Sequence, residues 1–270
     1  WDLLGQHAMP LPLAETMLAR AWLATAGVAL PQGAIALAPH LVAERGGVCA
    51  TGVRGARVAQ WVLGQQGGDL LLLPVAGAQA SPSIFVLDAD LHWNAEALAS
   101  AIRVAAPASL LVAQAGLISA LLAGSLLTTF ETTLNFANER QQFGRPIGKF
   151  QAIQHELAVM AEHVSAARMA AQIGCEAGGA LADPLKVAVG KARTGEAAVE
   201  VASLAHSIHG AIGFTTEFDL QLFTRRLHLW RQTAGSESYW QLQAGQALVA
   251  AGGMSLDVIR QITDSAAVAA

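Results

Sequence analysis

The stretch that decides the fold is Asn138–Gln154, which reads NERQQFGRPIGKFQAIQ in a chain of 270 residues. Residues 133–142 before the turn contain neither Gly nor Pro and favour a helix. Gly144 and Pro146 then interrupt the backbone, because Pro lacks a helix donor and Gly resists helical ordering. From Phe150 onward, apolar residues recur every three or four positions, so the sequence predicts helix, tight turn, helix.

The turn is cationic, with Arg140, Arg145 and Lys149 close together in the sequence. An Arg offers a fixed fork of donors, so Arg140 at the edge of such a corner can hold a phosphate and the ring beside it. The other interpretation is a helical hairpin whose charged turn is simply solvated, since charged turns are common. Spacing alone leaves both interpretations open.

The amino-acid identities in this stretch are more specific than the spacing of its residues. Arg-x-x-Phe-Gly-x-Pro-Ile-x-x-Phe-Gln, starting at Arg140, resembles the acyl-CoA dehydrogenase family. A second block, His209–Glu217, is similar to that family's glycine-rich His-Gly-Gly-x-Gly-Phe-Thr segment. The resemblance covers Leu117 to about Ala250 and is faint before Ala95.

The resemblance implies a mainly α fold with a small β segment. We expect a C-terminal helical bundle at 94–270, a reduced β-domain at 31–93, and at 1–30 the remnant of a truncated N-terminal helical domain. The expected helices are Ala95–Val104, Ser109–Gln142, Phe150–Glu176, Pro184–Ile208, Leu220–Trp230 and Glu237–Leu248. Short apolar runs between glycines predict strands, in a small antiparallel sheet or incomplete barrel, at Ala34–Leu37, Val48–Ala50, Arg57–Leu63, Leu70–Val75 and Ile84–Leu87.

Composition narrows the class of protein. Hydrophobic residues make up 53% of the chain and charged residues only 13%, against about 25% in ordinary soluble domains, so we expect other subunits to cover much of the surface. A net charge of -4 argues against nucleic-acid binding. Cys49 and Cys175 are too few for a disulfide framework or a zinc site, which fits a cytoplasmic setting. His155-Glu156 begins a zinc-protease motif, but Val159 stands where the second His would fall, so no metal site is predicted.

One segment is apolar enough to raise the question of a membrane span. Val104–Phe130 carries no charged residue and is long enough to cross a bilayer. It also contains Pro107, several Ser and Thr residues and Gln114, and a buried bundle helix can be equally apolar. Since the family buries this helix between subunits, the resemblance favours a soluble protein without a membrane span.

The family's chemistry needs a carboxylate that removes a proton beside the thioester carbonyl and a flavin that accepts the hydride. One branch of the family places a Glu in Tyr-Glu-Gly-Thr, a phrase that falls here on Thr233–Ser236 with Ala234 at the base position. In another branch the base would lie near Gln114, where no acidic residue occurs before Glu131. Both recognised base positions are therefore empty, and the nearby Glu237 is interpreted as an acid at a helix start.

The residues that would bind the cofactor are better retained than the catalytic base. The resemblance implies that they meet the pyrophosphate and adenosine half of an FAD held mainly by a neighbouring subunit. Gly210 would let the backbone approach closely, Ser207 replaces a common Gln, and Phe136 replaces a common Tyr. For the aromatic residues, core packing is the alternative. The cofactor-binding residues implied are Arg140, Phe143, Phe150, Gln151, Ser207, Gly210, Ala211 and Ser236.

Three interpretations follow. The first is a subunit of a heteromeric, FAD-dependent acyl-CoA dehydrogenase, similar to bacterial enzymes for steroid side-chain CoA thioesters. A longer partner chain would supply the Glu base in a heterotetramer, with electron-transfer flavoprotein as a possible electron acceptor, and this chain alone would be inactive. The second is a non-catalytic interaction or assembly protein that kept the helical bundle without flavin. The third is a homomeric flavoenzyme that uses an unrecognised base such as Glu131.

Overall fold

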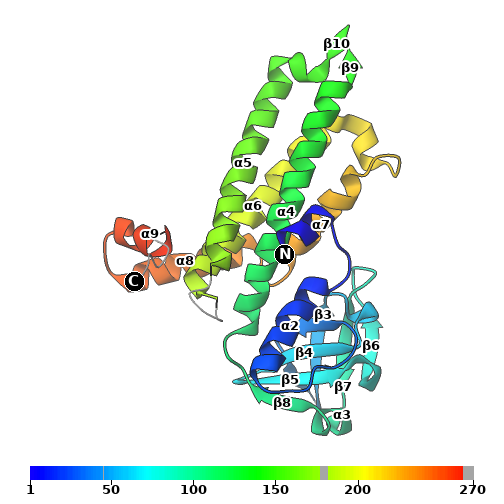
Figure 1. Ribbon diagram of the computed structural model, residues 1–270, viewed down its shortest axis with the longest axis vertical. Helices are drawn as coiled ribbons and strands as arrows, with labels where there is room; N and C mark the ends of the chain where they lie inside the picture. The colour runs from blue at the N-terminus through cyan, green and yellow to red at the C-terminus, as the bar shows by residue number, and fades with distance from the viewer. Residues whose placement is uncertain (45, 177–181, 264–270) are drawn as a thin grey trace. The chain divides into compact units, whose positions relative to one another are not determined.

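A computed structural model describes residues 1–44, 46–176 and 182–263 of the chain (Figure 1). The chain forms two compact units. Residues 9–114 form a sheet unit, and residues 1–8 together with 115–270 form a helical unit. The mainly α fold with a small β part is confirmed.

The sheet unit contains two four-stranded sheets. The first has the order β1 (Ile35–Ala38), β4 (Trp61–Gln66), β5 (Asp69–Pro74) and β8 (Ile102–Ala105). The second has the order β2 (Val42–Glu44), β3 (Gly47–Val53), β7 (Ala89–Trp93) and β6 (Ala78–Pro82). Every pairing is antiparallel except that of β1 with β4. The sequence predicted a small antiparallel sheet or an incomplete barrel; the structure has two mostly antiparallel four-stranded sheets.

Strand β5 is buried on both of its faces, which explains its unbroken run of leucines. Leu71 and Leu73 pack into a core that includes Trp93 from the second sheet. Leu70 and Leu72 pack on the other face, in a core with residues of α2 (Leu13–Thr25). Successive side chains of a strand point to opposite faces, so one leucine run serves two cores.

The helical unit is built around α4 (Leu110–Glu139), α5 (Gln151–Cys175) and α6 (Pro184–His209). Figure 1 shows α4 and α5 side by side, joined at one end by the hairpin of β9 (Gln141–Gln142) and β10 (Arg145–Pro146). Helices α5 and α6 pack closely where glycines face each other, since a Cβ on Gly190 would lie 2.9 Å from the Ala170 carbonyl oxygen. The remaining elements are α1 (Asp2–Gln6), η3 (Ile147–Lys149), η4 (Gly210–Phe214), α7 (Leu220–Gln232), α8 (Glu237–Ala251) and α9 (Ser255–Thr263).

Several expected elements need correction. The helix expected at 95–104 ends early, as α3 (Ala95–Ala99), and β8 follows it. No strand forms at 84–87, where Ile84 is 92% exposed; the strand of this region is β6, which includes Ser81 and Pro82. Helix α9 was not predicted. The two units also divide at residues other than 30/31 and 93/94, and the three-domain division itself stays a prediction.

Helix α4 is the apolar segment that raised the question of a membrane span. Within the described residues it is the one helix long and apolar enough to cross a bilayer, with a mean hydropathy of 2.0 in its most apolar window. Yet 78% of that window is buried inside the protein, as in the core helix of a bundle. Several of its hydroxyl side chains donate to carbonyl oxygens of the same helix, such as Thr129 Oγ1 to the Ser125 carbonyl oxygen at 2.8 Å, whereas the buried Ser125 hydroxyl has no hydrogen-bond partner within the described residues. These features agree with a buried bundle helix.

Candidate functional site

A cavity of about 560 Å³ opens where the hairpin between α4 and α5 meets the end of α6. Its walls come from the last turns of α4, the hairpin, the start of α5, the end of α6 and η4. The lining residues are Phe136, Arg140, Gln142, Phe143, Ile147, Phe150, Ile153, Ser207, Ile208, His209, Gly210, Ala211 and Ile212. All of them belong to the helical unit.

The hairpin is a two-residue turn that presents Phe143 at the cavity. Gln142 pairs with Arg145, and the two residues between them have positive φ, 51° at Phe143 and 78° at Gly144. This is the φ pattern of a type I′ turn, which suits Gly but costs a bulky residue roughly 1 kcal/mol. The Phe143 side chain is 92% exposed, so core burial does not offset that cost. Backbone strain of this kind is concentrated at functional sites.

Arg140 follows directly after α4 and is exposed. Its backbone joins the turn to η3, since the Ile147 amide donates to the Arg140 carbonyl oxygen at 2.8 Å. Within the described residues, none of the salt bridges involves the Arg140 guanidinium. The aromatic wall beside it is Phe150, whose ring meets Phe143 edge-on at 6.1 Å. A cation and aromatic rings therefore share one cavity, as the sequence predicted.

The opposite element, α6, ends at the cavity in Gly210, whose φ of 64° and ψ of -146° stop the helix. Apart from its chain neighbours, no described residue has an atom within 4 Å of the place where a Cβ on Gly210 would stand, so the backbone here is open to a ligand. His209 is buried, and its Nδ1 lies 2.8 Å from the Ala205 carbonyl oxygen. Its ring stacks on Phe136 at 4.2 Å, and burial lowers the pKa of this imidazole. His209 therefore presents a neutral ring at neutral pH.

The structure brings most of the predicted cofactor residues together, but not all of them. Gln151 begins α5, is exposed and does not line the cavity. Ser236 lies elsewhere, where it caps α8 by accepting from the Tyr239 amide at 3.5 Å. Lys191, which holds the loop beside Ser236, stands sixteen positions before Ser207 on α6, about 24 Å along the helix. The predicted residues that line the cavity are Arg140, Phe143, Phe150, Ser207, Gly210 and Ala211.

Sequence reasoning assigned no role to several residues of the walls. His209 stood inside the quoted glycine block but received no role, and Ile147 and Ile153 lay in the first block as ordinary apolar residues. Phe136 was noted only as a replacement for Tyr. These residues could have been predicted from their positions within or next to the two motif blocks, because the fold brings those two blocks together around one cavity.

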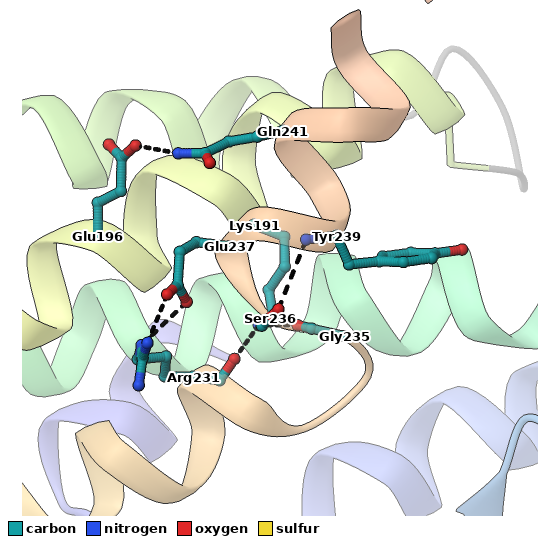
Figure 2. Close-up of polar contacts among 8 residues, drawn as sticks. All are labelled: Lys191, Glu196, Arg231, Gly235, Ser236, Glu237, Tyr239 and Gln241. Carbon is teal, nitrogen blue, oxygen red and sulfur yellow. Dashed lines mark hydrogen bonds and ion pairs between the residues drawn. The ribbon is translucent and has the colours of Figure 1, made fainter. Parts of the chain in front are cut away.

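The loop at Thr233–Ser236, where the resemblance places the family's base, is held by Lys191, which donates to the Gly235 carbonyl oxygen (Figure 2). Ala234 has a φ of 57°, in the left-handed region, and its carbonyl oxygen accepts from Trp240 Nε1 at 2.8 Å. Glu237 begins α8 and points to Arg231, whose Nε and an Nη donate to its carboxylate at 2.9 and 2.5 Å. Burial raises the pKa of Glu237, but the Arg231 contacts more than offset this and hold it below its usual range. A carboxylate paired in this way is a poor general base.

Lys191 holds the same loop from α6 (Figure 2). Its Nζ donates to the carbonyl oxygens of Arg231 and Gly235, each at 2.8 Å, and its side chain is fully buried. Burial is the main cause that lowers the pKa of Lys191 to about 7; the nearby Glu237 raises it and Arg231 lowers it further. The two carbonyl contacts tie the end of α7 to the start of α8.

Comparison with known proteins identifies the family. Residues 105–249, more than half of the chain, match the acyl-CoA dehydrogenase C-terminal domain. The chain is 32% identical over 120 residues to a 3-sulfinopropanoyl-CoA desulfinase of Paraburkholderia xenovorans, covering 44% of this chain and 31% of that protein. It is 33% identical over 105 residues to the acyl-CoA dehydrogenase IpdE2 of Mycobacterium tuberculosis, covering 39% of this chain and 32% of that protein. These matches span only about a third of each relative's length.

Solved structures agree on the fold over nearly the whole chain. A variant of the Tcur3481–Tcur3483 steroid ACAD superposes with a TM-score of 0.77 and 23% identity, over 93% of this chain and 79% of that one. The ChsE4–ChsE5 complex from Mycobacterium tuberculosis gives a TM-score of 0.76 and 21% identity, over 92% and 78%. At such low sequence identity, these superpositions show a shared fold. The match to the acyl-CoA dehydrogenase C-terminal domain shows common ancestry. The chain belongs to the acyl-CoA dehydrogenase family.

Proposed function

We propose that this chain is a subunit of an FAD-dependent acyl-CoA dehydrogenase in which a longer partner chain supplies the catalytic glutamate. The carrying observation is that six of the eight residues predicted to bind the cofactor line one cavity, whereas position 234, where the resemblance places the base, holds Ala. The neighbouring acid, Glu237, is committed to Arg231. The other candidate, Glu131, lies exposed on α4 and has no role in the proposal.

The cavity fits the adenosine diphosphate half of FAD. Its volume falls inside the roughly 300–1,000 Å³ of small-molecule sites. Arg140 offers a planar fork for the pyrophosphate, and Phe143 and Phe150 offer apolar faces for the adenine. Gly210 leaves room for the ribose to approach the backbone. When bound, FAD would supply the hydride acceptor of the dehydrogenation.

The chain's own residues bind and orient in this proposal, and they remove no proton. Removal of the proton beside the thioester carbonyl needs a carboxylate, which neither Ala234 nor the paired Glu237 provides. We therefore place the base, and the flavin ring, on the partner chain. Two solved structures of this fold are named as pairs of chains, which supports a heteromeric assembly, and the proposed form is a heterotetramer.

The substrate we propose is an acyl-CoA thioester, with a steroid side-chain CoA as the first to try, since one structural relative is named a steroid ACAD. The test is to purify the chain alone and together with an acyl-CoA dehydrogenase chain encoded beside it. Flavin absorbance, mass from light scattering and turnover with an artificial electron acceptor are then measured. The chain alone should show weak flavin binding and no turnover, and the complex should carry one FAD per pair of unlike chains. Turnover by the isolated chain contradicts the proposal.

The second candidate function is a non-catalytic assembly protein that no longer binds flavin. The Ser207 side chain favours it, because the shorter Ser stands where the family commonly has Gln. A complex that forms at full strength without flavin, and that gains no flavin from this chain, would support this candidate.

Replacing Arg140 by Ala should lower the flavin content of the complex while leaving its assembly intact. A charge-assisted contact to a pyrophosphate contributes roughly 1.5–3 kcal/mol, which corresponds to a loss of about ten- to a hundredfold in affinity. The measurement is flavin quantitation after dialysis, with light scattering to confirm the assembly.

The matched control for this prediction is Arg168→Ala, an exposed arginine on α5 in the same unit that does not line the cavity. Arg168→Ala should keep the wild-type flavin content. Equal flavin retention in both variants would remove Arg140 from the site.

A further inference from the structure

Ser207 and Glu156 meet beside the cavity, from two different helices. Ser207 lies in the last turn of α6, is exposed and lines the cavity. Glu156 lies in the first turns of α5 and is half-buried. The Ser207 hydroxyl donates to Glu156 Oε1 at 3.3 Å. This contact joins a wall of the cavity to a carboxylate just outside it.

The contact determines the direction in which the Ser207 hydroxyl hydrogen points. An ionised carboxylate accepts hydrogen bonds but donates none, so the one hydrogen of the hydroxyl points to Glu156. The oxygen of Ser207 then has only lone pairs to offer toward the cavity. A serine without such a partner rotates its hydrogen to suit a donor or an acceptor.

The burial of Glu156 strengthens this commitment. Its second oxygen, Oε2, is shielded from solvent and has no hydrogen-bond partner within the described residues. A half-buried carboxylate with one shielded, unsatisfied oxygen gains from each donor it keeps, so releasing the Ser207 hydrogen carries a cost. The Ser207 oxygen therefore stays an acceptor toward the cavity.

We propose that Ser207, oriented by Glu156, recognises the exocyclic amino group of adenine and rejects a 6-oxo purine. Ser207 is the residue that would touch the ligand, and Glu156 is a positioning residue that acts through it. The inference rests on the proposed function, because it assigns the adenine end of the same cavity whose Arg140 would hold the pyrophosphate. It also shows how a shorter Ser can serve where the family commonly has Gln.

The choice of ligand group follows from chemistry. The 6-amino group of adenine donates hydrogen bonds, whereas the 6-oxo group of hypoxanthine accepts them. A fixed acceptor therefore pairs with ADP and faces a second acceptor in IDP. Sites that hydrogen-bond a donor group discriminate strongly against ligands that lack it, because the site is left with an unpaired polar group.

The test uses ADP and IDP as probes, titrated calorimetrically into the flavin-free complex of this chain with the partner chain. The wild-type complex should bind ADP about tenfold more tightly than IDP, the effect of roughly one hydrogen bond. In Glu156→Gln, the amide can donate to Ser207 and so release the hydroxyl hydrogen into the cavity. The preference for ADP should then fall to less than about twofold, while the melting temperature stays near that of the wild type.

Two further variants separate the possible outcomes. Ser207→Ala should lose the preference with Glu156 intact, and Glu162→Gln, an exposed acid on the same helix, should keep it. Equal binding of ADP and IDP by the wild type, with ADP binding that still needs Arg140, overturns this inference and leaves the proposed function standing. If neither nucleotide binds, or if Arg140→Ala binds ADP as well as the wild type does, the proposed function fails too.

Discussion

Replacing Arg54 by Met should lower the free energy of unfolding of the sheet unit by about 3–5 kcal/mol. Arg54 Nη1 lies 2.7 Å from Glu15 Oε1, and the two side chains are 5% and 0% exposed. The Arg54→Met change leaves the Glu15 carboxylate buried without its cation, and the cost of an uncompensated buried charge exceeds the gain from an added apolar side chain. Burial already raises the pKa of Glu15 despite the neighbouring Arg54.

Native-state hydrogen exchange at the β5 amides is the suitable measurement, since it reports the opening of this unit by itself. The matched control is Arg103→Met, which breaks an ion pair with Asp69 of the same 2.7 Å length but with side chains 51% and 40% exposed. That change should cost less than about 1 kcal/mol. The double change of Glu15 and Arg54 to Met should recover most of the loss. A loss below about 1 kcal/mol in the single variant is the contrary result.

The stability of the helical unit should rise with pH above neutrality because of Lys191. Its pKa is about 7 in the folded chain against an ordinary value of 10.5, so between these values the unfolded chain binds one more proton. The free energy of unfolding therefore increases with pH in this window, by up to about 1.4 kcal/mol per pH unit. Urea unfolding followed by far-UV circular dichroism at pH 7, 8 and 9 measures the slope.

The variant that isolates this effect is Lys191→Met, which should remove the slope while lowering the stability, because two buried carbonyl oxygens lose their donor. Lys186→Met provides the control, since Lys186 lies on the same helix and reaches Glu176 only at 4.0 Å. It should keep the wild-type slope. If the wild type and Lys191→Met show parallel pH dependence, the lysine does not titrate in this range.

The sequence predicted the parts of the fold that local rules control. The three-and-four spacing of apolar residues predicted α5, and the Gly and Pro residues of the turn predicted the break at the hairpin. The strand at 78–82 was missed because Ser81 and Pro82 look like a break, and the stretch at 84–87 was misassigned because it is apolar yet exposed. An apolar run shows what can be buried; the partners that bury it come from tertiary structure.

The residues of the site also divide into those that local sequence motifs predicted and those that depend on tertiary contacts. Arg140 and Gly210 were predicted as cofactor-binding residues from their places in the two family motifs, and the structure brings them to one cavity. Glu156 was singled out only as part of an incomplete zinc motif, because Ser207, its contact on the next helix, lies 51 positions away in the sequence. Ser236 was included although it is the last residue of the base motif, and the length of helix α6 separates that loop from the cavity. Contacts of this range follow from helix packing, which the spacing of one segment does not contain.

The loop at Ala234 bears on how such a chain can arise in evolution. Its shape is held by Lys191 and Trp240 through backbone carbonyl oxygens, and no side chain at position 234 takes part in those contacts. Residues that tolerate a left-handed φ can therefore replace one another at this position without rebuilding the turn. A duplicated gene is free to lose a carboxylate there in a single substitution and still encode a folded bundle. On the proposed function, specialisation into one chain that removes the proton and another that completes the cofactor site requires no rebuilding of this turn.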